Sequence, residues 1–135
     1  MDSKAERLLN GKNLVFLATI MSDGSPQVTP VWGNYANSHI LINTAEGRLK
    51  HKNILNDSRV AVSVVDHNNP LDMTTIRGKV VEIVSDYEYI HANQLTMQYM
   101  GINEYPFKRP GEKRIIFKIK PEKIFVLPEL QMNHD

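Results

Sequence analysis

Several kinds of site are excluded because the residues they need are missing. The 135-residue sequence contains no cysteine, which excludes a disulfide scaffold, a thiolate metal site and a cysteine nucleophile. Its five histidines show no metal-ligand spacing, so we expect no metal site. Phosphate-binding glycine loops and the serine-nucleophile elbow are also missing. We therefore name no catalytic residue, a pattern typical of proteins in which a bound cofactor performs the reaction.

Net charge and long apolar runs are equally scarce. Sixteen Lys and Arg against fifteen Asp and Glu give a net charge of +1, and the sequence shows no basic stripe with interleaved aromatics. The longest apolar run, 14–18, is too short to span a bilayer, and residues 1–7 lack the apolar region of a signal peptide. We expect no nucleic-acid or membrane partner and a cytoplasmic location, which the lack of cysteine fits.

The chain has the length of one domain, 1–135, with a real core. Periodicity and turn residues predict helices at 3–9 (with Ser3 as N-cap), 49–56 and 87–100, the last ended by Gly101. Strands are predicted at 14–20, 27–32, 39–43, 59–65, 73–84, 114–119 and 123–127, with turns at 22–26 and 33–38. Segment 14–20 is apolar on both faces and should be buried on both sides. The predicted fold is mainly β, a closed or nearly closed antiparallel barrel of six or seven strands.

Proline and glycine mark two special places in these strands. Pro30 lacks a backbone donor, so it belongs at a sheet edge or break, where a flat ligand can lie against the backbone of Thr29, Pro30, Val31 and Trp32. Trp32 is the single tryptophan, and core packing is its alternative role. Thr29 projects from the opposite face to Trp32, so the two side chains cannot line one pocket. Gly78 inside a strand indicates a bulge or a close backbone approach.

Segment 40–54 predicts a strand, a turn and the entrance of a helix, with basic, hydroxyl and amide side chains at the junction. The first N–H groups of a helix lack helical partners and the dipole is positive there, so the junction suits a phosphate-bearing ligand. If Arg48 is helical, it shares a face with Lys52 and Lys50 points away. If Arg48 lies in the extended entrance, it converges with Lys50 on one anion. The alternative is a solvated basic surface.

Amide and hydroxyl side chains add to this junction. Asn53 follows Leu49 by four residues, on the face that should be apolar, and a buried amide must find backbone or ligand partners. Either Asn43 or Thr44 can act as the N-cap of the helix, and the alternative role is a contact with the phosphate. Arg77 and Lys79 share a strand face, where cross-strand charge pairing is the alternative to binding. The candidate ligand-binding residues from these segments are Asn43, Thr44, Arg48, Lys50, Asn53 and Arg77.

Five segments in this order resemble the pyridoxamine 5'-phosphate oxidase-like split-barrel superfamily, closest to its flavin/deazaflavin oxidoreductase branch. They are residues 17–19, 23–32, 44–54, 57–62 and 76–80. The resemblance covers roughly residues 5–85, and the part after Tyr87 matches less well, so no role is carried onto the helix at 87–100. The residues that bind the substrate phosphate in a true pyridoxamine-phosphate oxidase are not recognisable, which argues against vitamin B6 synthesis.

The resemblance implies a homodimer of split barrels with FMN or the deazaflavin coenzyme F-420 at the subunit interface. Arg48, Lys50 and Asn53 would hold the cofactor phosphate with Thr44 nearby, and Thr29 to Trp32 would face the ring. Residues 71–77, including Arg77, would reach the site from the other subunit. The implied function is hydride or electron-pair transfer to a small organic substrate. A non-catalytic carrier of the same cofactor is the alternative, and a small nucleic-acid-binding barrel is disfavoured by charge.

Overall fold

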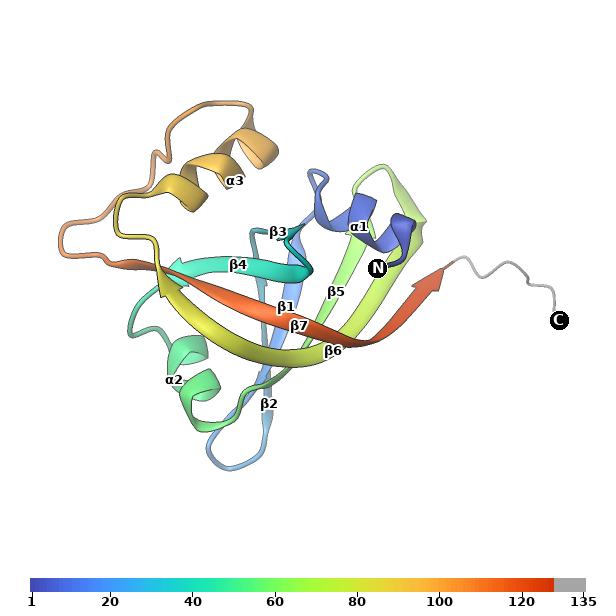
Figure 1. Cartoon of the computed structure of the whole chain (residues 1–135), viewed down its shortest axis with the longest axis horizontal. Coiled ribbons are helices and arrows are strands. Elements are labelled where there is room, and N and C mark those ends of the chain that lie inside the picture. The colour runs from blue at the N-terminus through green and yellow to red at the C-terminus, as the bar shows by residue number, and fades with distance from the viewer. Residues whose placement is uncertain (128–135) are drawn as a thin grey trace, which may run out of the picture.

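The computed structural model describes residues 1–127, which form three short helices and seven strands (Figure 1). In chain order these elements are α1 (Ser3–Leu9), β1 (Val15–Ile20), β2 (Pro26–Val31), β3 (Gly33–Ala36), β4 (His39–Ala45), α2 (Leu49–Asn56), β5 (Arg59–Asp66), β6 (Asn69–Ser85), α3 (Ile90–Met100) and β7 (Arg114–Leu127). The prediction of a mainly β fold is confirmed. None of these helices is long and apolar enough to cross a membrane.

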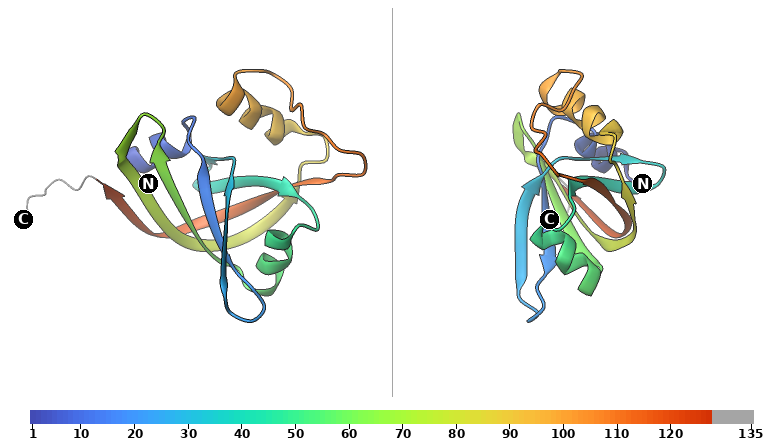
Figure 2. Two further views of the ribbon diagram at one scale, coloured as in Figure 1. Left: turned by 180° about the vertical axis from the view of Figure 1, so that it is seen from behind. Right: turned by 90° about the vertical axis from the view of Figure 1, so that its left-hand side faces the viewer.

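All seven strands belong to one antiparallel sheet in the order β2-β1-β5-β6-β7-β4-β3. Strands β2 and β3 are therefore the two edges of the sheet, yet only Trp32 separates them in the sequence. The two edges must meet at this residue, so the sheet curls into an almost closed barrel (Figure 2). The expected split barrel of antiparallel strands is confirmed, and Pro30 lies on an edge strand, as its missing donor requires.

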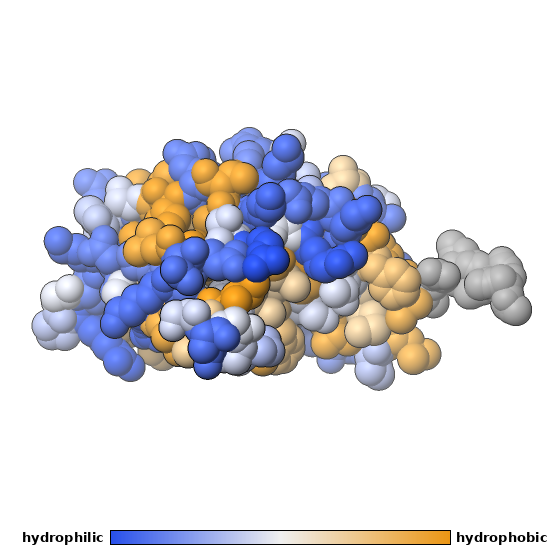
Figure 3. Space-filling view, turned by 90° about the horizontal axis from the view of Figure 1, so that it is seen from below, coloured by the Kyte–Doolittle hydropathy of each residue, from blue (hydrophilic) through white to orange (hydrophobic). Residues whose placement is uncertain are grey.

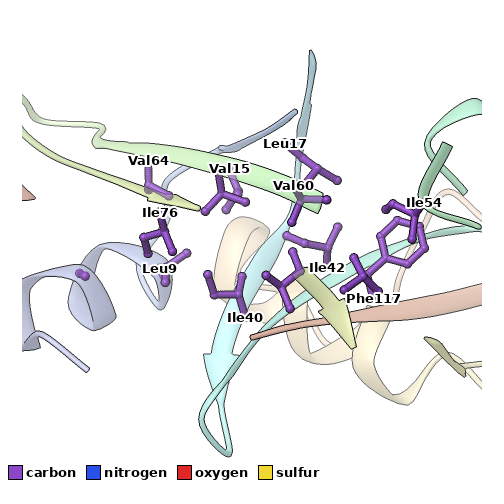
Figure 4. Close-up of a cluster of buried hydrophobic side chains, with 14 of the residues drawn as sticks. Leu9, Val15, Leu17, Ile40, Ile42, Ile54, Val60, Val64, Ile76 and Phe117 are labelled. Carbon is purple, nitrogen blue, oxygen red and sulfur yellow. The ribbon is translucent and has the colours of Figure 1, made fainter. Parts of the chain in front are cut away.

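The barrel interior is filled by apolar side chains, aliphatic except for Phe117, that point toward one another from β1, β4, β5, β6 and β7 (Figure 4). Alternation within each strand sends every second side chain inward, and α1 covers one end with its buried apolar face. The expectation that β1 is buried on both sides is wrong for this chain. Phe16 points outward and is 39% exposed, because no second layer from residues 1–127 covers the outer face.

Three predicted boundaries differ from the structure. The predicted turn at 33–38 contains strand β3, and only Asn37 and Ser38 turn, both with positive φ as in a two-residue hairpin loop. The two predicted C-terminal strands are one strand, β7, which keeps its pairing with β6 across an irregularity near Pro121. The N-cap of α1 is Asp2 and not Ser3, since the Asp2 carboxylate accepts from the N–H groups of Lys4 and Ala5.

The predicted bulge or close approach at Gly78 is confirmed. The register between β6 and β7 shifts between Arg77 and Gly78, where Gly78 lies opposite Pro121. A Cβ atom at Gly78 would overlap the carbonyl group of Lys120. Glycine therefore allows the two long strands to approach each other at the point where they bend.

Helix α3 begins three residues later than predicted. Tyr89 has a left-handed backbone, φ 63°, and so ends the turn that precedes the helix. The Asp86 carboxylate accepts from the N–H groups of His91 and Ala92 and thereby caps the first turn. Gly101 ends α3 in the left-handed conformation, as predicted. The helix lies beyond the end of the barrel, between the end of β6 and the start of β7 (Figure 1).

Candidate functional site

A cavity of about 230 Å³ opens where the two edges of the sheet meet. Its walls come from the β2–β3 corner, the end of β4, the start of α2, helix α3, the loop after α3 and the start of β7. We call it the cationic cavity, and it is lined by Pro30, Val31, Trp32, Asn43, Thr44, Arg48, Lys50, Ala92, Leu95, Tyr105, Phe107 and Arg114. Seven of the ten candidate residues from the sequence are thus brought together, from two segments of the chain.

Arg48 and Lys50 form the cationic wall at the entrance of α2. Arg48 occupies the N-cap position with φ −69° and ψ 162°, which is the extended alternative, and both residues line the cavity. Lys50 is only 9% exposed. Burial lowers the pKa of Lys50, and the charges of Arg48 and Arg114 lower it further. Within residues 1–127, neither Arg48 nor Lys50 forms an ion pair, so this wall offers positive charge to a ligand.

Asn43 and Thr44 line the cavity but do not cap α2, since no side chain caps this helix. The capping role considered for them is therefore wrong. The Asn43 amide nitrogen donates to Asp86 Oδ2 and to His91 Nδ1, each at 3.0 Å. Its oxygen accepts from Arg114 Nε at 2.9 Å. Asn43 therefore uses every amide donor within the protein and connects β4, α3 and β7.

Sequence reasoning missed Arg114, the first residue of β7. It lies beside Ala45 in the sheet register, and its side chain is held by Asn43 and by Glu112, at 3.2 Å from Nη1 to Oε2. Its guanidinium lies 5.1 Å from the centre of the Tyr105 ring, a cation–π contact. No local motif marks this arginine, because strand pairing is what brings it next to β4.

Aromatic side chains form a second part of the cavity lining. Trp32 stacks on Tyr99 with ring centres 4.9 Å apart and planes 5° apart, so the core-packing role considered for it is partly realised. The same indole contacts Tyr105 edge to face at 6.4 Å, and Tyr105 contacts Phe107 at 5.6 Å. Pro30 and Val31 add the edge of β2. The aromatic part of the lining therefore suits a flat apolar group, and the cationic part suits an anionic group.

Three candidate residues lie outside the cationic cavity. Asn53 is buried, and its amide donates to Thr19 Oγ1 at 3.0 Å and to Met21 Sδ at 3.3 Å, both from outside the cavity. Thr29 does not line it, and its buried hydroxyl has no partner within residues 1–127. The expectation that the two faces of this strand cannot line one pocket is wrong, because Val31, on the same face as Thr29, lines the cavity together with Trp32.

Arg77 is the third candidate residue outside the cationic cavity, and its side chain lies on the outer face of β6. The register places it opposite Lys123, while Lys79 lies opposite Arg59 and Lys120. The charge pairing considered for Arg77 and Lys79 is therefore wrong, because their cross-strand charged neighbours are also cations. If Arg77 contacts a ligand in the cationic cavity, that cavity must belong to another copy of the chain.

The cavity lining holds no carboxylate and no histidine among residues 1–127. Over the same residues, no three His, Asp or Glu side chains gather in a way that could hold a metal ion. The arrangement can bind and orient a ligand that has an anionic group and a planar ring, and its polar groups act as hydrogen-bond donors.

Fold and site together define a split-barrel protein with a cavity lined by three cationic side chains at its corner. The family model described as pyridoxamine 5'-phosphate oxidase matches residues 1–127, and the chain belongs to this family. Comparison with curated proteins found no match.

Solved structures support the fold. A structure described as an F420 reductase is 29% identical, with a TM-score of 0.81 over 93% of this chain and 98% of that one. HupZ from Group A Streptococcus is 20% identical, with a TM-score of 0.64 over 94% of each chain. A putative pyridoxamine 5'-phosphate oxidase from Lactobacillus delbrueckii is 22% identical, with a TM-score of 0.61 over 93% of each chain. The last two show the fold alone.

Proposed function

We propose that this protein is an oxidoreductase that binds FMN or the deazaflavin coenzyme F-420 in the cationic cavity and reduces or oxidises a small organic substrate. The F420 reductase among the similar structures supports this class of reaction. The observation that carries the proposal is that Arg48 and Lys50, which form no ion pair within residues 1–127, line the same cavity as a group of aromatic side chains.

The cations fit the phosphate of such a cofactor. Lys50 is held buried at the first turn of α2 without a carboxylate partner within residues 1–127, which is costly unless a ligand supplies the negative charge. Arg48 adds directed donors next to it, and the positive end of the helix dipole favours an anion at the same place. Thr44 lines the cavity beside them and offers a hydroxyl.

The β2 edge fits the ring. Pro30, Val31 and Trp32 present an edge of the sheet with one N–H group fewer, and Tyr105 and Phe107 extend this aromatic part of the lining, with the Tyr105 ring edge to face with Trp32. When bound, a flavin-type cofactor supplies the hydride or electron pair. The chain's own residues would hold its phosphate, fix the plane of its ring and exclude water from one side, which orients the substrate for transfer.

A second copy of the chain would complete the site. In register across the outer face of β2, β1, β5, β6 and β7 lies one row of small and apolar side chains, Pro30, Phe16, Ser63, Thr75 and Phe125. The next row begins with Val28, Ala18 and Ala61 and ends with the cations Arg77 and Lys123. Apolar side chains also reach the surface between hydrophilic ones on the face shown in Figure 3. We infer that the outer face forms a homodimer interface, which would bring residues 71–77 with Arg77 toward the partner's cavity.

Cofactor titration tests the cationic wall. Purified protein is titrated with FMN and with coenzyme F-420, and binding is followed by absorption and fluorescence, which distinguish the two chromophores. Substitution of both Arg48 and Lys50 by alanine removes two charge-assisted contacts of about 1.5–3 kcal/mol each, so affinity should fall by about a hundredfold or more. Lys52→Ala is the matched control, because Lys52 lies exposed on the same helix. Equal affinities in the double variant and the wild type would refute the site.

Turnover separates the enzyme from the carrier. The reduced cofactor is mixed with a panel of quinones, enones and dyes, with and without protein. An enzyme should oxidise the cofactor faster than the protein-free control with at least one acceptor. If binding is tight and no acceptor is reduced faster, the protein is a carrier of the cofactor. The absence of an acid or base from the lining among residues 1–127 is compatible with either outcome.

A further inference from the structure

Arg114 is the best-positioned cation in the cavity, although no motif in the sequence marks it. Nε donates to Asn43 Oδ1 at 2.9 Å, and Nη1 donates to Glu112 Oε2 at 3.2 Å. The residue is buried, yet it lines the cavity, and Nη2 makes no hydrogen bond within residues 1–127. Two of the three guanidinium nitrogens therefore fix the side chain, and the third remains for a ligand.

Strand pairing places Arg114 close to the entrance of α2. Arg114 pairs with Ala45, the last residue of β4, and the neighbouring Lys113 carbonyl accepts from the N–H of Glu46 at 2.8 Å. Only Gly47 then separates Glu46 from Arg48. The positive charge of Arg114 also contributes to the lowered pKa of Lys50. Three cations therefore line one cavity, and within residues 1–127 only Arg114 of these three is paired with a carboxylate.

A polar chain continues from Arg114 into α3. The side-chain oxygen of Asn43 accepts a hydrogen bond from Arg114, and its amide nitrogen donates one to Asp86. The Asp86 carboxylate in turn caps the first turn of α3. Displacing Arg114 would leave the buried Asn43 oxygen without its donor, which costs free energy. The side chain that faces the ligand and the start of α3 are therefore linked through one buried amide.

We propose that Arg114 is a third cationic ligand of the cofactor phosphate, and that Asn43 and Asp86 couple this contact to the first turn of α3. This inference rests on the proposed function. Because two hydrogen bonds already hold the guanidinium, little side-chain entropy is lost when the anion binds. Binding of the phosphate fixes Arg114 further, and the coupling stabilises the start of α3 at the same time.

The comparison of FMN with riboflavin, which lacks the phosphate, tests the contact. Arg114→Gln should weaken FMN binding by about tenfold to a hundredfold and riboflavin binding by less than about threefold, since a charged hydrogen bond is lost only with FMN. Arg114→Lys keeps the charge but not the planar fork and should lie between the wild type and Arg114→Gln. Arg109→Gln removes an exposed arginine from the same loop and serves as the control. Equal losses for both ligands, or none, overturn the proposal.

Two further measurements keep this test independent of the proposed function and of folding. Circular dichroism identifies a variant that fails to fold, in which case Arg114→Lys decides. Inorganic phosphate is the second probe, and it should raise the melting temperature of the wild type and not that of Arg114→Gln. If this holds but no cofactor binds, the proposed function fails, and Arg114 stands as a ligand of phosphate but not of the cofactor. If FMN binds both proteins equally, the role of Arg114 fails and the function stands.

Amide hydrogen exchange tests the coupling to α3. FMN should slow exchange at residues 90–94 of the wild type by more than riboflavin does, and this difference should disappear in Arg114→Gln. A structural role alone would change exchange in the free protein without making it depend on the phosphate. Identical protection of these residues by FMN and riboflavin in the wild type overturns the coupling.

Discussion

The barrel and the segment that follows β6 are held in place by different forces. The barrel core is apolar, with Val15, Leu17 and Phe117 fully buried among side chains from five strands (Figure 4). The segment 86–113, which we call the cap, contains α3 and the loop after it. Polar side chains anchor the cap at both ends of α3, where Asp86 accepts from three donors and Gln98 donates to three backbone carbonyls.

This difference determines how precisely each region is placed. Apolar burial is non-directional, so it stabilises the barrel without choosing one exact position for a neighbouring segment. Hydrogen bonds impose distance and angle. Tyr99 donates to the carbonyl of Asn13 and contacts the corner at Gly33, and its ring stacks on Trp32. The cap therefore sits against the β2–β3 corner in one position, and the cavity forms between the two regions.

Two phenylalanines give the largest test of this comparison. Phe117 is fully buried in the barrel, whereas Phe107 in the cap is 53% exposed. Phe117→Ala should lower the free energy of unfolding by about 3–5 kcal/mol, because a cavity replaces the ring. Phe107→Ala should change it by only about 0.5 kcal/mol, as is typical of surface positions. Urea unfolding followed by circular dichroism measures both.

The two variants also separate folding from binding. Phe107→Ala should weaken ligand binding, because the Phe107 ring lines the cavity. The Phe117 ring does not line the cavity. A loss of stability in Phe107→Ala as large as that in Phe117→Ala would show that the cap belongs to the barrel core, and the comparison would be broken.

Most of the barrel could be predicted from the sequence because its signals are local. Helix α2 has the predicted bounds, and β5 and β6 extend the predicted strands by a few residues. The predicted break in β7 was wrong, because pairing with β6 continues the strand past Pro121. Whether a strand continues at such a residue depends on tertiary contacts and not on the local sequence. Strand β3 was not predicted, because its residues were assigned to a turn that covers 33–38. Asn37 and Ser38 alone reverse the chain, which leaves the residues before them free to form a strand.

The cavity was predictable where its residues are close in sequence, as with Arg48 and Lys50 or Pro30 and Trp32. Arg114 could not be found this way, since it meets Asn43 only through the pairing of β4 with β7. The cap residues Tyr105 and Phe107 come from a loop without periodicity. Asn53 was correctly expected to be buried on its helix, but one sequence could not show that Thr19 and Met21 contact it.

Acid titration distinguishes the polar anchor of the cap from the apolar barrel. Burial lowers the pKa of His91 from 6.5 to about 4, the Asp86 carboxylate opposes this shift, and the Arg114 guanidinium adds to it. The neutral ring accepts from Asn43 at Nδ1 and donates to Asn34 from Nε2. Between pH 6.5 and 4 the unfolded chain binds the proton and the folded chain does not. Stability from this group is complete above pH 6.5 and falls by about 3 kcal/mol at most as the pH drops to 4.

Urea unfolding at several pH values measures this loss. His91→Gln cannot titrate and should show a flatter pH dependence across the same window. His39→Gln, which replaces a partly exposed histidine on β4, is the control and should keep the slope of the wild type. The same slope in His91→Gln and the wild type would mean that His91 is not the group responsible, and that acid does not act first on the cap.

Two glycines give the smallest contrast between the regions. Gly78→Ala forces a Cβ atom into the Lys120 carbonyl, so β6 and β7 must separate, at a cost of about 2 kcal/mol in unfolding free energy. Gly101 has open space around it but a φ of 73°, so Gly101→Ala should cost about 1 kcal/mol for its left-handed backbone. Hydrogen exchange should show the first loss throughout the barrel and the second only near the end of α3. A barrel-wide loss in Gly101→Ala would mean that the cap and the barrel unfold as one unit, in spite of their different anchors.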